Sequence, residues 1–461
     1  MDTMNEDFRI DILENLEEFL HNNDDEKIRE FIENVHPADI AEVLVDLEDD
    51  DQNRLFTLLP WDMATDVLED INSETFSRLV RALPIEQKIV VLDMMSSDDM
   101  VDKLGELSEL RQQEIMAFLN DEDADDVKAL LVYDEDTAGG IMTKDYISVF
   151  QDTTCYEAIE ILREEAPEAE TIYYVFVTDH IERLVGVISL RELIVSKPGQ
   201  PIEEIMNPNV ISVNVNDDQE EVARVVSKYD LLAIPVVDDE NTLIGIITVD
   251  DVIDVIEEEA TEDILKFVGS SELEDYDDEG LGTKIITSVR SRLPWLIITV
   301  FGGMLSATVI SGFQDALSTN ATLALFMPLL AGMGGNVGTQ SSTLTVRNIA
   351  TGNIETGDVM KTLIHEIFVG MLVGLACSLL VAAIVFFMQD GNYLMCLIVG
   401  VAMWANMVTA ATIGTLVPLT FKRIGIDPAV ASAPFITTTI DITGLSIYFT
   451  LATLMITTLG N

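Results

Sequence analysis

Residues 316–346 read ALSTNATLALFMPLLAGMGGNVGTQSSTLTV, thirty-one residues without a charged side chain. A bilayer core requires about 20 consecutive apolar residues in a helix, so this stretch is long enough to span a membrane. Further charge-free stretches occupy residues 293–314, 367–389 and 391–421. A last apolar stretch, 428–461, is interrupted by a single charge, Asp441. The sequence therefore predicts five transmembrane helices within residues 293–461.

Net charge is distributed unevenly along the chain. The 461 residues include 82 acidic and 25 basic side chains, a net charge of −57, yet 48% of them are hydrophobic and the mean hydropathy is +0.28. Residues 293–461 carry only −3, so −54 lies in residues 1–292. This acidity repels phosphate backbones and argues against nucleic acid as a partner. The three cysteines have no spacing typical of a disulfide framework or a zinc site.

The basic residues near the predicted spans give an orientation. They precede the first span, lie between the second and third, or follow the fourth: Lys284, Arg290, Arg292, Arg347, Lys361, Lys422 and Arg423. These positions share one side of the membrane, which the positive-inside rule identifies as cytoplasmic. The acidic, polar start MDTMNEDFRI does not resemble a cleaved signal peptide. We expect a multi-pass plasma (inner) membrane protein with a cytoplasmic N-terminus and an external C-terminus.

Two predicted membrane segments are unusually polar. The stretch 328–343 contains four glycines, Asn336 and Gln340. Irregular or polar backbone at this depth is tolerated only against protein or a water-filled path. Close packing of helices through small residues is the alternative explanation.

The second polar segment contains Asp441. Thr437 and Asp441 are separated by four residues and share one face of a helix, and Pro434 frees a backbone carbonyl one turn earlier. A carboxylate in the bilayer costs at least about 2.5 kcal/mol and needs a partner. Because no Lys, Arg or His lies deep in the five spans, the remaining partners are a proton or a cation.

The acidic half of the chain contains an internal repeat. Ile141-Met142 recurs as Ile205-Met206, and Gly186 recurs as Gly245. Each copy has two runs rich in β-branched residues around a turn, which predicts paired strands. The repeat resembles a tandem CBS-domain pair, a module that often binds adenine nucleotides or ions.

Residues upstream of the repeat show helical periodicity. Pro37, Pro60 and Pro84 recur every 23 or 24 residues, each at the start of a helical pattern. Short helices at a regular period predict a stacked helical array.

Acidic side chains crowd the segment 250–263, DDVIDVIEEEATED, which follows the second repeat. Like charges at i,i+3 and i,i+4 destabilise a helix by about 0.2–0.5 kcal/mol per pair. Hard divalent cations bound by carboxylates and water would relieve this repulsion. General adaptation to high salt is the competing explanation of the acidity.

Taken together, the chain resembles the MgtE family of magnesium channels and transporters over nearly its full length. The most specific motifs are GMGGNVGTQSSTL (332–344), VDDVIDVIEEEATED (249–263) and DPAVASAPFITTTIDITG (427–444). The resemblance implies a homodimer with Asp441, Asn336 and Thr437 along its ion pathway. It also implies closure by cytosolic Mg²⁺. The corresponding regulatory metal ligands are Asp251, Asp254, Glu259, Glu262 and Asp263, with Asp218, Glu220 and Asp230 from the second CBS copy.

Some positions depart from the family pattern. Ala433 stands where family members carry Asn, and Leu231 stands where an aromatic residue contacts adenine. The nucleotide motif SLRD reads SLRE here, with Arg191 and Glu192 as its last residues. These departures argue against ATP binding, and ATP ranks behind Mg²⁺ as a cofactor.

We therefore expect a multidomain fold with an all-α helical N domain (1–137), an α+β CBS pair (138–200 and 201–263), a connecting helix (264–292) and a five-helix transmembrane domain (293–461). The predicted function is a magnesium-selective, channel-like importer that cytosolic Mg²⁺ closes. An exchanger that couples divalent cations to H⁺ or Na⁺ and a CBS nucleotide sensor with a membrane anchor are the alternatives. An enzyme is not expected, because no nucleophile–base pattern or P-loop occurs.

Overall fold

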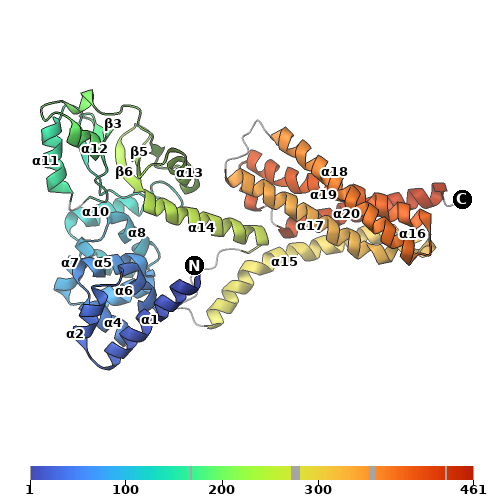
Figure 1. Cartoon of the computed structure of the whole chain (residues 1–461), viewed down its shortest axis with the longest axis horizontal. Coiled ribbons are helices and arrows are strands. Elements are labelled where there is room, and N and C mark those ends of the chain that lie inside the picture. Colours follow the sequence, from blue (N-terminus) through green and yellow to red (C-terminus); the bar gives the residue numbers. More distant parts are fainter. Residues whose placement is uncertain (1, 167–168, 271–280, 352–358, 431–432, 460–461) are drawn as a thin grey trace. The chain divides into compact units, whose positions relative to one another are not determined.

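The computed structural model describes residues 2–166, 169–270, 281–351, 359–430 and 433–459 (Figure 1). Contacts within the chain divide it into two compact units, Met1–Glu257 and Glu258–Asn461. Each unit is described by itself. The border between them falls inside helix α14 (Val249–Val268).

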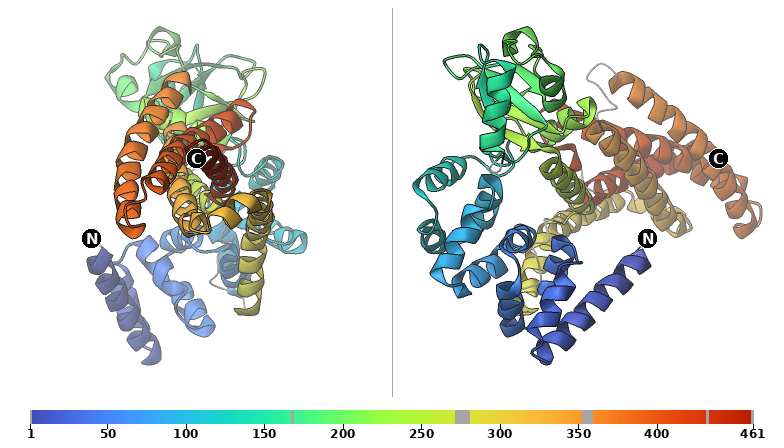
Figure 2. Two further views of the ribbon diagram at one scale, coloured as in Figure 1. Left: turned by 90° about the vertical axis from the view of Figure 1, so that its right-hand side faces the viewer. Right: turned by 60° about the vertical axis from the view of Figure 1, so that its left-hand side comes forward.

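The first unit begins with ten helices: α1 (Asp2–His21), α2 (Asp25–Ile32), α3 (Pro37–Leu44), α4 (Asp49–Leu58), α5 (Trp61–Asp70), α6 (Ser73–Ala82), α7 (Ile85–Asp93), α8 (Ser97–Gly105), α9 (Glu109–Met116) and α10 (Asp121–Leu130). Most of them pack on a helix two positions along the chain, such as α3 on α5 and α4 on α6. Figure 2 shows this stack in blue and cyan. The predicted helical array is confirmed.

The recurring prolines mark helix starts, as the sequence predicts. Pro37 is the first residue of α3, and Pro60 and Pro84 are the N-cap residues of α5 and α7. Proline suits these positions because the first backbone N–H groups of a helix have no partner within the helix.

Two small sheets with the same topology follow the helical array. Their elements are β1 (Ser148–Phe150), α11 (Cys155–Glu165), β2 (Tyr174–Thr178), β3 (Leu184–Ser189), α12 (Leu190–Val195), η1 (Ile202–Glu204), β4 (Val213–Asn214), α13 (Gln219–Tyr229), β5 (Ala233–Val237) and β6 (Leu243–Thr248). In each sheet the first strand is parallel to the second, and the second is antiparallel to the third. The register of the antiparallel pair shifts at Val177/Thr178 in one copy and at Val236/Val237 in the other. The internal repeat is therefore a structural repeat.

The repeated Gly and Met residues of the two copies contact each other reciprocally. A Cβ on Gly186 would lie 2.3 Å from the sulfur of Met206, and a Cβ on Gly245 would lie 2.6 Å from the sulfur of Met142. Each copy therefore places its methionine against the glycine of the other. This packing explains why both residues recur in the sequence.

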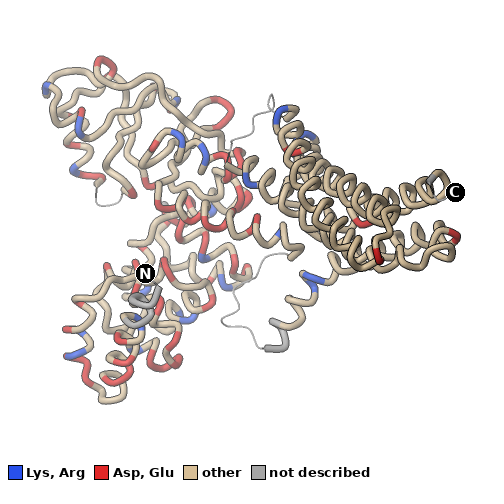
Figure 3. Tube along the Cα trace, turned by 45° about the vertical axis from the view of Figure 1, so that its right-hand side comes forward, with Lys and Arg blue, Asp and Glu red and all other residues tan. Residues whose placement is uncertain are grey.

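The second unit is helical and contains α15 (Leu281–Gly312), α16 (Gln314–Thr319), α17 (Leu323–Ala350), α18 (Val359–Met388), α19 (Tyr393–Arg423), η2 (Pro428–Val430) and α20 (Ala433–Leu459). Its core lies where α17, α19 and α20 pack together, with α18 against α19 and α15 against α20. Figure 3 shows that Asp and Glu residues are frequent in the first unit and sparse in these helices. This matches the charge division predicted from the sequence.

The predicted membrane helices differ in how apolar they are. Among the described residues, four helices are long and apolar enough to cross a membrane: Ile285–Gly312, Val359–Met388, Tyr393–Arg423 and Ala433–Thr458. The second predicted span, 316–346, corresponds to α17, which has 28 residues but is not one of these four. The Gly, Asn, Gln, Ser and Thr residues of α17 lower its hydropathy. This helix is therefore adapted to contact protein or water more than lipid.

The interval 264–292, predicted as a connecting helix, contains parts of two helices. Its first residues end α14, and residues from Leu281 onward belong to α15, which continues into the first span. Residues 271–280 of the interval lie outside the described part of the chain.

Candidate functional site

Asp441 lies within the apolar helix α20, two turns after its start. Its side chain is partly buried, and no described residue forms a hydrogen bond or ion pair with its carboxylate. Thr437 lies one turn earlier, and its hydroxyl donates to the carbonyl oxygens of Ala433 at 2.8 Å and Pro434 at 3.2 Å. The threonine oxygen can therefore still accept a hydrogen bond from water.

The glycine-rich segment is a regular part of α17, and its glycines allow close helix packing. A Cβ on Gly338 would lie 1.9 Å from Ile440 of α20, and one on Gly335 would lie 3.4 Å from Cγ2 of Thr437. The close-packing explanation is therefore correct for these glycines. Pro434 likewise causes no break, since it is the second residue of α20.

Asn336 and Gln340 occupy a different face of α17 from the packed glycines. Both side chains are exposed, and their spacing of four residues aligns them on one side of the helix. The contact of Gly335 with Thr437 places this helix beside the segment that bears Asp441. A single chain therefore places α17 beside α20 but leaves the side chains of Asn336 and Gln340 exposed.

A second carboxylate in this region, Glu366 of α18, was not among the residues predicted from the sequence. Its side chain is 11% exposed, and the Ser341 hydroxyl of α17 donates to its Oε2 at 2.9 Å. His365 Nδ1 lies 3.3 Å from its Oε1. In the sequence Glu366 directly precedes the charge-free stretch 367–389, and only packing shows that it is buried.

In the first unit, acidic residues from four separate segments lie close enough to interact electrostatically. We call the following set the acidic cluster: Glu69 of α5, Asp98 and Asp99 of α8, Glu170, and Asp250, Asp251 and Asp254 of α14. The sequence predicted only Asp251 and Asp254 among these as metal ligands. Glu69, Asp98, Asp99 and Glu170 lie far from these two in the sequence, so their proximity depends on the packing of the helical array against the CBS pair.

Burial and neighbouring carboxylates make ionisation less favourable for Glu69, Glu170 and Asp251. Burial, together with nearby carboxylates, raises the pKa of Glu69 to about 8 and that of Glu170 to about 7. Burial also raises the pKa of Asp251 to about 6, although a hydrogen bond from Thr248 opposes the shift. Each group therefore favours protonation or a nearby cation more than an exposed carboxyl does.

Asp98 is the most buried member of the acidic cluster. It is 7% exposed, and its Oδ1 has no hydrogen-bond partner within the described structure. Burial raises the pKa of Asp98 well above its ordinary value, and the neighbouring Asp251 and Asp99 raise it further. An unpaired buried carboxylate oxygen is unfavourable, so this oxygen is the strongest candidate in the cluster for contact with a cation.

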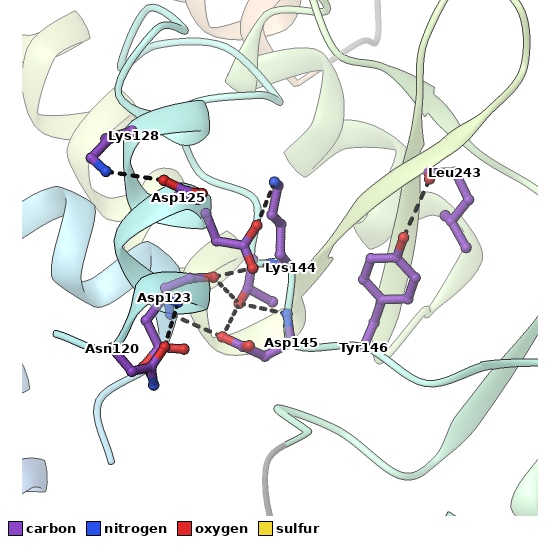
Figure 4. Close-up of polar contacts among 11 residues, drawn as sticks. Asn120, Asp123, Asp125, Lys128, Lys144, Asp145, Tyr146 and Leu243 are labelled. Atoms are coloured by element: carbon purple, nitrogen blue, oxygen red, sulfur yellow. Dashed lines mark hydrogen bonds and ion pairs between the residues drawn. The ribbon is translucent and has the colours of Figure 1, made fainter. Parts of the chain in front are cut away.

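Hydrogen bonds and an ion pair also join the helical array to the CBS pair. Ser97 of α8 donates its backbone N–H to Asp145 at 2.9 Å, and Lys144 forms an ion pair with Asp126 of α10 at 2.7 Å. Figure 4 shows Lys144 and Asp145 beside α10, and the Tyr146 hydroxyl donating to the carbonyl of Leu243. These contacts hold α8 and α10 near the acidic cluster.

The predicted ligands Glu259, Glu262 and Asp263 lie further along α14, in the second unit. Glu262 forms an ion pair with Lys266, which also pairs with Asp427 at 3.0 Å. Burial lowers the pKa of Lys266, but its bonds to Glu262 and Asp427 outweigh this effect and raise it overall. Lys266 thereby links the end of α14 to the segment before α20.

The predicted ligands in the second CBS copy do not form a single site within one chain. Asp218 caps the start of α13 and accepts the N–H of Glu220 at 2.9 Å, whereas Asp230 is the left-handed C-cap residue of the same helix. Asp218 and Asp230 are twelve positions apart along α13, which corresponds to a distance of roughly 18 Å along the helix axis. Asp218 also lines a polar cavity of about 600 Å³ with Tyr133 and Asn216.

The predicted nucleotide residues Arg191 and Glu192 are both exposed at the start of α12. Glu192 accepts hydrogen bonds from the N–H and the hydroxyl of Ser189, at 3.0 and 2.7 Å, and completes a capping box. The capping of α12 therefore accounts for a glutamate at position 192 without any bound ligand.

Among the described residues, no three His, Cys, Asp or Glu side chains are close enough to form a ready metal site. The acidic cluster and Asp441 instead offer separate carboxylates. Mg²⁺ suits such sites, because it retains several of its waters and typically takes one or two carboxylates from a protein.

Comparison with known protein families assigns each part of the chain. Residues 35–136 match the MgtE intracellular N domain, residues 138–197 and 202–258 each match the CBS domain, and residues 327–451 match a divalent cation transporter family. These matches confirm the family and the fold class predicted from the sequence.

Individual relatives match over nearly the whole chain. The magnesium transporter MgtE of Thermus thermophilus is 38% identical over 444 residues, 96% of this chain and 98% of that protein. The magnesium transporter MgtE of Bacillus subtilis is 35% identical over 435 residues, 94% of this chain and 95% of that protein. A crystal structure of the cytosolic domain of the Mg²⁺ channel MgtE with ATP is 40% identical and covers 52% of this chain and 98% of that one, with a TM-score of 0.50. By this similarity the chain belongs to the MgtE family of magnesium transporters, multi-pass membrane proteins that are not enzymes.

Proposed function

We propose that this protein is a channel-like importer in which Asp441 contacts Mg²⁺ through the water shell of the ion. The observation that carries the proposal is a carboxylate inside an apolar helix without a partner among the described residues. Thr437 offers a second oxygen on the same face, one turn away. Because Mg²⁺ loses its waters reluctantly, oxygen atoms that accept hydrogen bonds from those waters suit it well.

We propose a homodimer because the polar face of α17 lies exposed in a single chain. Asn336 and Gln340 would be unfavourable against lipid, since unsatisfied amides in the bilayer are costly. A second copy related by a two-fold axis would cover this face and bring two Asp441 carboxylates to one pathway.

The basic residues that flank the helices favour a cytoplasmic N-terminus and an external C-terminus. In this orientation the membrane potential drives Mg²⁺ inward, with about 4.6 kcal/mol per 100 mV for a divalent ion.

Cytosolic Mg²⁺ would close the importer by binding to the acidic region. Asp251 and Asp254 would contribute to a site with the unpaired oxygen of Asp98, and bound Mg²⁺ would offset the repulsion within the acidic cluster. Glu259, Glu262 and Asp263 would bind further ions along α14. Asp218 with Glu220, and separately Asp230, would bind others at the two ends of α13.

ATP is an alternative regulatory ligand for the CBS pair. The solved cytosolic domain with ATP supports it, whereas Glu192 is already engaged in capping α12. Arg191 would be the phosphate contact.

Magnesium flux into proteoliposomes tests the transport proposal. We expect Asp441→Asn to lose most of its flux and the exposed loop variant Asp390→Asn to retain it. Raising Mg²⁺ on the side of the acidic unit should close the wild-type protein. Wild-type flux in Asp441→Asn would exclude Asp441 as the ion site.

An ion-coupled exchanger is the second candidate, favoured by the buried Glu366 beside His365. Flux that follows the Mg²⁺ gradient alone, at any pH or Na⁺ gradient, would exclude coupling. Flux that reverses with an imposed proton gradient would support it.

A further inference from the structure

Asn406 is a polar side chain buried in the middle of the membrane helix α19. It is 1% exposed, and its Nδ2 donates to the carbonyl oxygen of Leu330 in α17 at 2.7 Å. Its Oδ1 is buried and has no partner in the described structure. A half-satisfied amide at this depth is costly, so its presence calls for a specific role.

Two glycines from different helices provide the space for this amide. A Cβ on Gly334 of α17 would lie 2.6 Å from Nδ2 of Asn406, and a Cβ on Gly444 of α20 would lie 2.3 Å from its Oδ1. Gly334 is two residues before Asn336, and Gly444 is three residues after Asp441. The Asn406 amide therefore lies between the two helices that contribute the proposed ion contacts.

The orientation of the amide is fixed by its surroundings. The carbonyl of Leu330 requires a donor, so the NH₂ group faces α17 and the oxygen faces α20. The hydrogen bond holds α17 to α19, while the oxygen prevents α20 from moving closer at Gly444. The amide thus limits how α17 and α20 approach each other, including the contact between Gly335 and Thr437.

We infer that Asn406 is a positioning residue that sets the width of the ion pathway and thereby its selectivity for a hydrated ion. This inference rests on the proposed function of Asp441. A pathway of fixed width favours an ion that keeps its water shell, as Mg²⁺ does, over Ca²⁺, which exchanges water for protein oxygens more readily. Because Asn406 is 1% exposed, its role in this inference is to position α17 and α20, and it does not contact the ion.

Fluxes of Mg²⁺ and Ca²⁺ in proteoliposomes, normalised to folded protein, test the inference. We expect Asn406→Ala to retain Mg²⁺ flux and to lower the Mg²⁺/Ca²⁺ flux ratio several-fold. Gly444→Ala should lose most flux for both ions, because its methyl group would collide with the amide. The double variant Asn406→Ala/Gly444→Ala should recover flux, since the space is free again, but keep the lowered ratio.

Two controls separate positioning from packing. Met403→Ala creates a cavity in the same helix at a fully buried residue that is not among the nearest neighbours of either glycine, and it should lower thermal stability without changing the ratio. Asn406→Ser serves as a second variant if Asn406→Ala does not fold, and it should lower the ratio as well. A wild-type ratio in the folded Asn406 variants would overturn the inference. Asp441→Asn tests the ion site separately, because it should lose both fluxes.

Discussion

The hydroxyl of Ser341 in α17 donates a hydrogen bond of 2.9 Å to the carboxylate of Glu366 in α18. Ser341 and Glu366 are both buried, so the bond lies inside the helical bundle. Ser341 follows the glycine-rich segment by three residues, and its carbonyl oxygen accepts the hydroxyl of Thr345 at 2.7 Å. This pair links α18 to the helix that carries Asn336.

Replacing Glu366 should show whether its hydrogen bond or its negative charge stabilises the helical bundle. We expect Glu366→Ala to lower the thermal stability of the detergent-solubilised protein, because Ser341 loses its acceptor. The hydrogen-bond part of this loss is roughly 0.6–1.7 kcal/mol for a membrane helix pair. Glu366→Gln retains an acceptor and should remain close to wild type, as should His365→Ala, whose side chain is 73% exposed. Equal losses in the Gln and Ala variants would show that the charge itself stabilises the bundle.

Glu69 should make the stability of the first unit depend on pH. Its folded-state pKa of about 8 exceeds the ordinary value of 4.5, so the folded chain holds this proton more tightly than the unfolded chain does. Stability should therefore decrease as pH rises from about 4.5 to about 8. In the presence of a chelator, Glu69→Gln should raise the melting temperature at pH 8 and have little effect near pH 4.5. A stabilisation of equal size at both pH values, or the same effect in the exposed variant Glu74→Gln, would contradict this explanation.

The acidic region should lose its response to magnesium when its charges are removed. In the wild type we expect Mg²⁺ to slow proteolysis of the acidic N-terminal half of the chain, because the ion offsets repulsion among its carboxylates. The variant Asp251→Asn/Asp254→Asn/Glu259→Gln should lose this protection. A control with the same change in charge at exposed sites, Glu164→Gln/Glu203→Gln/Glu240→Gln, should keep it. Protection that persists in the first triple variant would favour general high-salt adaptation as the reason for the acidity.

The reciprocal glycine–methionine packing of the CBS pair should be sensitive to one methyl group. Gly186→Ala places a Cβ 2.3 Å from the Met206 sulfur, and overpacking of this kind costs about 1–3 kcal/mol. Gly199→Ala, with no atom within 4 Å of the added Cβ, is the matched control and should be neutral. The double variant Gly186→Ala/Met206→Ala should relieve the collision but retain a small cavity. Unfolding followed by circular dichroism would rank the variants, and a double variant no more stable than Gly186→Ala would argue against this contact as the cause.

Local patterns in the sequence determined the elements and their order. Charge-free stretches predicted the membrane helices, proline spacing predicted the starts of α3, α5 and α7, and the repeat predicted two matching sheets. These signals are readable because helix starts, strand periodicity and apolar length each depend on neighbouring residues. The sequence also revealed Asp441, because a single carboxylate in an apolar span can be recognised without knowing any contact with other residues.

Only the tertiary structure decided which distant side chains meet. The approach of Asp98 to Asp251, the bond from Ser341 to Glu366 and the position of Asn406 between Gly334 and Gly444 depend on how helices pack. The same packing shows that Gly334, Gly335 and Gly338 of α17 make close contacts within a regular helix. Sequence periodicity assigns a residue to a face of its own helix, but contact across helices depends on the shape of every side chain between them, which no local pattern encodes.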